Sequence, residues 1–211
     1  YILEVDITPN RADALSHYGV ARDLAAYYQF HGKVLNASFP ELKKMEKVGH
    51  LPINISIKDH QACPRYSGIT IKGVNVTESP GWLKKRLVAI GLVPINNIVD
   101  VTNYVMFEIG QPLHAFDYAR CGGEIEVKSD LDGADFITLD GQQRTIQSGE
   151  LMICNATQPM CIAGVFGGEE SGVSNGTKDI FLESAYFNPV SVRKTSKRHG
   201  LKTDASYRFE R

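Results

Sequence analysis

The glycine-rich segment at residues 163–172, AGVFGGEESG, is the feature that most limits which folds this chain can adopt. Such a segment can belong to a P-loop, but a P-loop needs Lys followed by Ser or Thr directly after its last glycine. Here Gly168 is followed by Glu169 and Glu170, whose carboxylates repel phosphate. The spacing of Gly164, Gly167 and Gly168 also differs from the G-x-G-x-x-G pattern of a dinucleotide-binding fold. We therefore expect these glycines to serve turns or close backbone contacts, not a nucleotide.

The composition indicates an ordinary soluble globular protein. The chain has 211 residues, of which 43% are hydrophobic and 22% are charged, enough for one large or two small domains. The formal net charge is −1, so nucleic acid would have to contact a local patch and not an overall positive field. No apolar run approaches the roughly 20 residues of a membrane span, and no signal peptide is visible. We expect a cytoplasmic protein without a membrane partner.

The cysteines favour reduced thiols. Cys63, Cys121, Cys154 and Cys161 lack C-x-x-C spacing, and none stands beside a histidine at the spacing of metal ligands. We expect neither a bound metal nor a disulfide.

Capping residues, prolines and glycines mark the ends of the expected helices. These helices span residues 16–32, 79–91, 96–110 and 188–200, and their expected caps are Ser16, Ser79 and Asn188. Apolar residues at helical spacing predict the buried faces: Val20, Ala21, Leu24, Ala25 and Tyr28 in the first helix, and Leu83, Leu87 and Ile90 in the second. In the third helix Thr102 lies among apolar neighbours, on the face of Ile98, Val105 and Ile109.

Short β-rich runs between turn residues predict strands. They lie within residues 1–8, 51–59, 65–74, 123–130, 136–146, 150–156 and 179–187, and the charged residues 40–50 are expected to form a linker or exposed turn. The combination of short strands with separate helices predicts an α+β fold.

Two polar residues in apolar surroundings are candidates for a functional site. His114 lies in the segment QPLHAFD, where a structural histidine is the more common explanation. Glu183 lies in IFLESAYF, a predicted buried strand, and a buried carboxylate is rare unless it is paired or hydrogen-bonded. The alternative for Glu183 is a strand edge from which it points to solvent. Neither a Ser-His-Asp order nor a G-x-S-x-G elbow supports a covalent hydrolase.

Residues 192–202 form a basic run with five Lys or Arg side chains and no acidic residue. A solvated helix face is one explanation, and contact with a phosphate backbone is the other.

Long motifs along the chain carry a family resemblance. The segments DITPNRADALSHYGVARDLAA, IVDVTNYVMFEIGQPLHAFD, IAGVFGGEESGVS and IFLESAYFNPVSVRKTSKRHGLKTDASYRFER occur in this order. Together they resemble the B3/B4 region of the β subunit of bacterial-type phenylalanyl-tRNA synthetases, from end to end of the chain. The resemblance implies an α+β module, with residues 1–47 as an N-terminal strand–helix segment and linker and residues 48–211 as the B3/B4 editing domain, packed as one compact unit.

In that family the module holds the editing site, where tyrosine wrongly attached to phenylalanine tRNA is removed by hydrolysis. The resemblance implies catalytic positions at His114, Thr102 and Asn103. It implies a substrate pocket at Glu183, Gly164, Thr203 and Ala205. Phe166 departs from the family pattern, which has Met there, and we expect this to alter only the packing behind the loop.

The resemblance also implies partners and cofactors. They are the mischarged tRNA and a catalytic α subunit in an α2β2 assembly, with ATP and Mg²⁺ in the whole enzyme and no cofactor in this segment. Two alternatives stay open: a structural or tRNA-docking module that does not edit, and a free-standing aminoacyl-tRNA deacylase.

The implied chemistry explains why Glu183 would be buried. A hydrophobic synthetic pocket cannot strongly reject an isostere that adds only a hydroxyl, so a second, hydrolytic site that prefers tyrosine is useful. A buried carboxylate can accept a hydrogen bond from the phenol, whereas phenylalanine would leave it unpaired. His114 is expected to orient the substrate or the attacking water. Gly164 is expected to let the main chain approach the aminoacyl group, with Gly167, Gly168 and Gly172 shaping the turn behind it.

Overall fold

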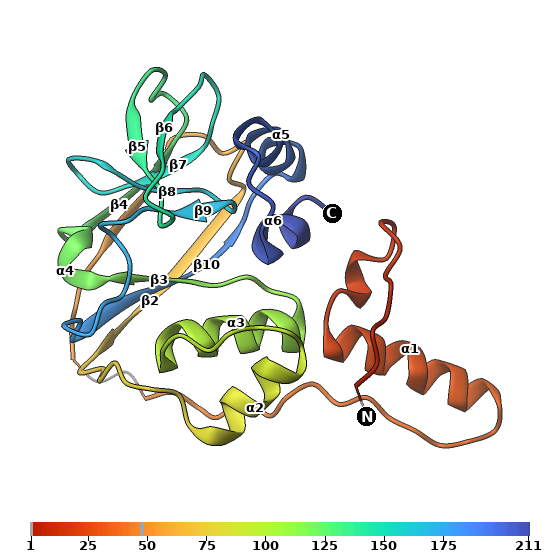
Figure 1. Cartoon of the computed structure of the whole chain (residues 1–211). Coiled ribbons are helices and arrows are strands. Elements are labelled where there is room, and N and C mark those ends of the chain that lie inside the picture. The colour runs from red at the N-terminus through yellow and green to blue at the C-terminus, as the bar shows by residue number, and fades with distance from the viewer. Residues whose placement is uncertain (1, 47–48) are drawn as a thin grey trace.

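A computed structural model describes residues 2–46 and 49–211 and confirms the α+β class (Figure 1). The helices are η1 (Ala12–Ala14), α1 (His17–Phe30), α2 (Gly81–Ala89), α3 (Asn97–Ile109), α4 (Tyr118–Cys121), α5 (Pro189–His199) and α6 (Asp204–Phe209). The strands are β1 (Asn54–Ile57), β2 (Arg65–Lys72), β3 (His114–Asp117), β4 (Glu124–Lys128), β5 (Asp135–Ile137), β6 (Gln143–Thr145), β7 (Met152–Cys154), β8 (Pro159–Ile162), β9 (Phe166–Gly167) and β10 (Asp179–Tyr186).

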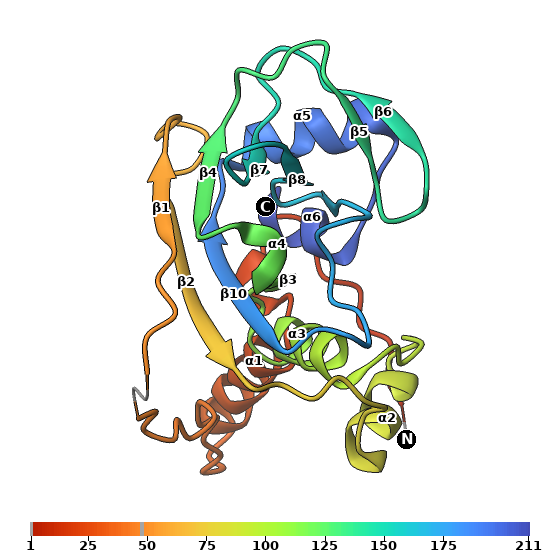
Figure 2. The same cartoon turned by 90° about the vertical axis from the view of Figure 1, so that its left-hand side faces the viewer.

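The strands form separate sheets (Figure 2). One sheet has the order β1-β4-β7-β8-β9, in which β1 and β4 are parallel and the other neighbours antiparallel. A second, antiparallel sheet has the order β2-β10-β3, so β10 is its central strand. Strands β5 and β6 pair with each other as a hairpin.

The core lies between these sheets and helix α5. Its largest fully buried side chains include Phe116, Phe181 and Phe187, and the rings of Phe116 and Phe181 stack with centroids 6.4 Å apart. Val192 on α5 belongs to the same cluster. The aromatic residues therefore join the β2-β10-β3 sheet to the C-terminal helices.

Most predicted helix ends are confirmed. Ser16 accepts a hydrogen bond from the Gly19 N–H, and Asn188 accepts from the N–H groups of Val190 and Ser191. The first helix ends near Gly32, which has a φ of +77°.

The predicted role of Ser79 as a helix cap is wrong. Pro80 is the N-cap residue of α2, and no side chain bonds to the first turn of that helix. The Ser79 hydroxyl instead donates to Asp100 Oδ2 at 2.5 Å, because the buried carboxylate on α3 needs donors.

The expected strand at residues 1–8 is also wrong, since residues 2–8 have no regular secondary structure. Ile2, Leu3 and Val5 are exposed, and no described strand lies beside them to accept ladder hydrogen bonds. Leu24, expected in the buried stripe of α1, is exposed as well. Residues 40–46 and 49–50 are exposed or half-buried without helix or strand, as the predicted linker requires, and residues 47 and 48 lie outside the described part.

Helix α1 lies beside α3, at the edge of the molecule (Figure 1). The imidazole Nδ1 of His17 donates to the Phe107 carbonyl at 2.9 Å, and Arg208 Nε donates to the Leu15 carbonyl at 3.2 Å. These bonds attach the N-terminal segment to α3 and α6. In the described part of the chain, no helix is both long and apolar enough to cross a membrane.

Candidate functional site

A cavity of about 620 Å³ lies where α3, β3, β10, the loop after β8 and the start of α6 meet. All seven residues predicted for the site line it: Thr102, Asn103, His114, Gly164, Glu183, Thr203 and Ala205. A volume of this size lies within the range of small-molecule sites. Segments more than 100 residues apart in the chain thus contribute to one site, and the functional roles of these residues remain predictions.

The strand register brings the two polar candidates together. Glu183 on β10 is paired directly with His114 on the antiparallel strand β3. Directly opposite residues in an antiparallel pair have side chains on the same face of the sheet. His114 and Glu183 therefore share the face that borders the cavity.

Glu183 is 5% exposed and lies on a central strand, so the alternative of a solvent-facing strand edge is wrong. Tyr66 Oη donates to Glu183 Oε2 at 2.7 Å. Burial raises the pKa of Glu183 to about 7, and the Tyr66 hydrogen bond opposes that rise. Burial also raises the pKa of Tyr66 well above 10, so its phenol remains a proton donor. Among the described residues, none donates to Oε1, which stays free to accept a hydrogen bond.

His114 is held as a neutral imidazole. Burial lowers its pKa to about 4, so it is uncharged at pH 7 and a weak base. Its ring packs edge-on against Phe116 at 4.4 Å between centroids. The buried Nε2 has no hydrogen-bond partner in the described structure, which is uncommon for a buried polar atom.

Cys161 also lines the cavity but is not a suitable nucleophile. Its Sγ donates to the carbonyls of Ile162 and Phe166 at 3.4 Å. Burial raises the pKa of this thiol well above 9, so it stays protonated at neutral pH.

Helix α3 presents Thr102 and Asn103 to the cavity. The helix is amphipathic, begins after the cap Asn96 and ends at Gly110, which has a φ of +88°. The Thr102 hydroxyl donates to the Val99 carbonyl at 2.7 Å, so its hydrogen is already engaged within the helix.

Thr203 and Ala205 reach the cavity from the start of α6. Thr203 caps this helix: its Oγ1 accepts from the Ser206 N–H at 3.0 Å and donates to the Val165 carbonyl at 3.1 Å. The second bond attaches α6 to the glycine-rich loop. The capping box that holds Thr203 therefore also positions one wall of the cavity.

The glycine-rich loop contains both kinds of glycine expected from the sequence. Gly164 has a φ of +69°, and a Cβ there would lie 2.9 Å from Phe187 and 3.1 Å from Phe209. Gly167 has an ordinary φ, but a Cβ would lie 3.0 Å from His114 Cε1. Gly164 is thus required by the backbone and the core, and its predicted approach to an aminoacyl group stays a prediction.

A model of the B3/4 domain matches residues 62–211. The chain belongs to the B3/4 domain family. The predicted resemblance is thereby confirmed.

Relatives of this B3/4 domain are found among synthetase subunits. The chain is 56% identical to the phenylalanine–tRNA ligase β subunit of Bacteroides fragilis and 50% identical to that of Aquifex aeolicus. Both alignments include 100% of this chain and 26% of the relative. It therefore spans about a quarter of the length of these relatives. A crystal structure of an N-terminal fragment of the phenylalanyl-tRNA synthetase β subunit from Pyrococcus horikoshii has a similar fold, with a TM-score of 0.52 and 15% identity over 92% of this chain and 60% of that one.

Sequence reasoning missed some residues of the B3/4 cavity. Tyr66, the hydrogen-bond partner of Glu183, lies 117 positions away in the chain, and no local pattern connects the two. Cys161 lines the cavity, but its spacing from the other cysteines carries no sign of this position. Phe166 lines the cavity itself, so its effect extends beyond the packing behind the loop.

The four cysteines are unpaired and buried in the structure. Within residues 2–46 and 49–211, no group of three or more His, Cys, Asp or Glu side chains gathers as a metal site. The predicted absence of a metal remains a prediction.

Proposed function

We propose that this B3/4 domain hydrolyses the ester of tyrosine wrongly attached to phenylalanine tRNA. The observation that carries the proposal is the buried Glu183 carboxylate on the wall of a largely apolar cavity, with Tyr66 bound to one oxygen and the other free. A tyrosine side chain can donate its phenol hydrogen to Oε1. A phenylalanine side chain cannot, and it would displace water from the carboxylate without replacing the hydrogen bond.

The surrounding groups suit a positioning role better than strong base catalysis. His114 is neutral at pH 7 and its pKa of about 4 makes it a poor proton acceptor, so we assign its imidazole to positioning the ester or the attacking water. Glu183 is assigned to recognition of the phenol. Burial raises the pKa of Cys161 well above 9, so we assign no nucleophilic role to this thiol.

The wider setting rests on the relatives, whose names describe β subunits of phenylalanine–tRNA ligase. We infer that the longer protein containing this chain assembles with a catalytic α subunit. In this assembly the α subunit attaches phenylalanine to its tRNA with ATP and Mg²⁺, and the B3/4 domain removes tyrosine. We propose that the ATP and Mg²⁺ sites lie outside this chain.

The experiment replaces Glu183 in the full-length enzyme and measures deacylation of preformed tyrosyl-tRNA and phenylalanyl-tRNA. At pH 8, where Glu183 with its pKa of about 7 is mostly ionised, loss of one hydrogen bond to its carboxylate should lower kcat/KM for tyrosyl-tRNA in Glu183→Ala by roughly tenfold to a hundredfold. Glu183→Gln, which has nearly the same shape and keeps an oxygen acceptor, should lose less. Aminoacylation with phenylalanine should be unchanged in both variants.

Glu169→Ala is the matched control, because Glu169 is exposed and does not line the cavity. Deacylation by Glu183→Ala with wild-type rate and selectivity would remove Glu183 from substrate recognition. Wild-type enzyme that does not deacylate tyrosyl-tRNA at all would instead favour the docking-module alternative.

A further inference from the structure

A second hollow of about 460 Å³ lies next to the cavity, between α5 and α6. We call it the basic groove; its lining includes Arg193, Lys197, Lys202, Thr203, Tyr207 and Arg211. Thr203 lines both hollows, so the basic groove and the cavity lie against the same residue.

The folded structure divides the basic run at residues 192–202 into two parts. Thr195 and Ser196 are buried, and Arg198 pairs with Glu150 at 2.8 Å. Arg193, Lys197 and Lys202 are exposed and line the groove. In the described part of the chain no carboxylate lies within ion-pair distance of these three cations. Cations gathered in a hollow without anionic partners favour a negatively charged ligand.

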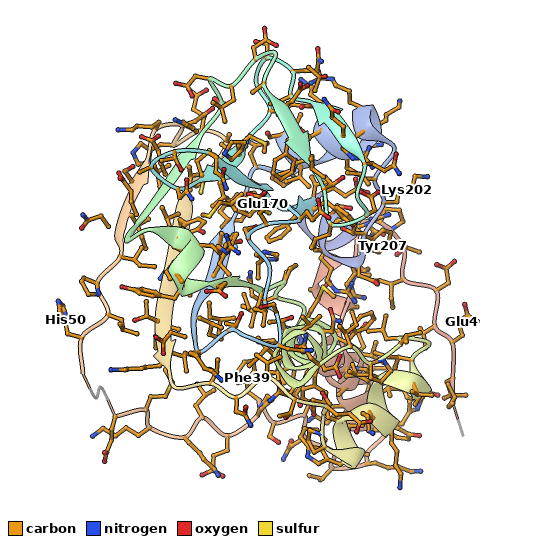
Figure 3. The ribbon with its side chains drawn as sticks, turned by 60° about the vertical axis from the view of Figure 1, so that its left-hand side comes forward. Glu4, Phe39, His50, Glu170, Lys202 and Tyr207 are labelled. Atoms are coloured by element: carbon orange, nitrogen blue, oxygen red, sulfur yellow. The ribbon has the colours of Figure 1, made fainter. Side chains whose placement is uncertain are left out.

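An exposed aromatic ring stands among these cations. Tyr207 is 37% exposed, and the Arg211 guanidinium lies over its ring at 3.4 Å from the centroid. Figure 3 shows Tyr207 and Lys202 on the same side of the molecule. Glu210 is the acidic member of the lining and is paired with Arg211 at 3.2 Å. An aromatic ring beside unpaired cations is the combination that holds single-stranded nucleic acid, through base stacking and phosphate contacts.

We propose that the basic groove binds the single-stranded 3′ end of the RNA whose aminoacyl group occupies the cavity. This inference rests on the proposed function, because it supplies the site for the part of the substrate that the cavity cannot hold. The shared position of Thr203 places the terminal ribose at the junction. The phosphates of the preceding nucleotides then contact Lys197 and Lys202, and an unpaired base stacks on Tyr207.

The test uses the full-length protein assembled with its synthetase partner, and the variant is Lys197→Gln/Lys202→Gln. Two lost phosphate contacts should lower kcat/KM for tyrosyl-tRNA deacylation roughly two- to thirtyfold at low salt. The plot of log kcat/KM against log salt concentration should become shallower by about 1.4, since each single-strand phosphate contact contributes about 0.7. Lys178→Gln/Lys194→Gln is the matched control: it removes the same charge from exposed lysines outside the groove lining, one of them on α5. Its salt slope should equal that of the wild type.

A second variant tests the stacking contact. Tyr207→Ala should lower kcat/KM by at least about fivefold, from the loss of one stacked base, and Tyr207→Phe should restore it. A hydroxyl contact in place of stacking would make the Ala and Phe variants equally slow, which would contradict this part of the proposal.

A binding measurement separates this inference from the editing proposal. The probe is tRNA carrying tyrosine through a non-hydrolysable amide and a photoreactive azide on its terminal adenine. Crosslinks should map to residues 193–211 in the wild type and fall in Lys197→Gln/Lys202→Gln. Crosslinks there without any deacylation would overturn editing but support the groove. Deacylation that depends on Glu183, with an unchanged salt slope in the double variant and crosslinks elsewhere, would overturn the groove but support editing.

Discussion

At the scale of single residues, burial shifts the pKa values of Glu183 and His114 in opposite directions. Burial raises the pKa of Glu183 from 4.5 to about 7 and lowers that of His114 from 6.5 to about 4. Between pH 4.5 and 7 the folded state holds the Glu183 proton that the unfolded chain releases, so this group costs stability as pH rises. Between pH 4 and 6.5 the unfolded chain holds the His114 proton, so stability grows as pH rises. The two effects nearly cancel, and the site combines a buried acid and a buried base with a small net dependence on pH.

Comparing the wild type with a variant that lacks one of the two groups should reveal how that group makes stability depend on pH. Urea unfolding of the chain from pH 4 to pH 8 measures this. Relative to Glu183→Gln, the wild type should lose about 3 kcal/mol between pH 4.5 and 7; relative to His114→Gln, it should gain about 3 kcal/mol between pH 4 and 6.5. Each comparison is a difference between two curves, so titrations common to both proteins cancel. Parallel curves in either comparison would show that the corresponding group keeps its ordinary pKa.

At the scale of elements, the same residue type serves different purposes at different helix starts. Ser16 caps α1, whereas Ser79, which also precedes a helix, donates its hydroxyl hydrogen to Asp100 on α3. Asp100 is fully buried and also accepts from the Ile95 N–H at 2.8 Å. The Asp100 carboxylate thus accepts hydrogen bonds from the segments that precede α2 and α3. These bonds fix the start of α2 against α3.

Substitution of Ser79 distinguishes a helix cap from a partner of Asp100. At a cap, Asp is as favourable as Ser. At the observed position, Ser79→Asp would place a second carboxylate against a buried one, so it should destabilise the chain by more than Ser79→Ala does. Ser79→Ala, which only removes a donor from Asp100, should cost about 1–3 kcal/mol. Urea unfolding measures the free energy of unfolding of both variants. A Ser79→Asp variant more stable than Ser79→Ala would support the cap interpretation instead.

At the scale of the whole molecule, the N-terminal segment buries its apolar side chains less than the rest of the chain does. Phe30, Val34 and Leu42 are among its exposed apolar side chains, whereas the sheets and α5 share one continuous core. The predicted boundary between residues 47 and 48 lies outside the described residues. The prediction of one compact unit stays a prediction.

Limited trypsin digestion of the chain tests that prediction. Lys43 and Lys44 are exposed in a stretch without helix or strand, so the first cuts should occur there. The body from about residue 51 to residue 211 should persist as one resistant fragment, because its strands pair across distant segments. Mass spectrometry of the products over time gives the result. Early cuts that divide residues 51–211 into two stable halves would contradict a single unit.

The sequence by itself determined the α+β class and most helix ends, because caps, glycine stops and residue periods are local. The positions of the candidate site came from the family resemblance of long motifs and not from these local patterns. The buried environment of Glu183 was also visible from its apolar neighbours, but its opposite, a solvent-facing edge, was equally compatible with strand alternation. The tertiary structure decided between them by placing β10 in the centre of a sheet, where its register sets Glu183 opposite His114 and brings Tyr66 to it across 117 positions. It likewise decided that residues 2–8 are not a strand and that Ser79 serves Asp100. Strand pairing and the satisfaction of buried charge depend on which distant segments meet, and no local pattern records that.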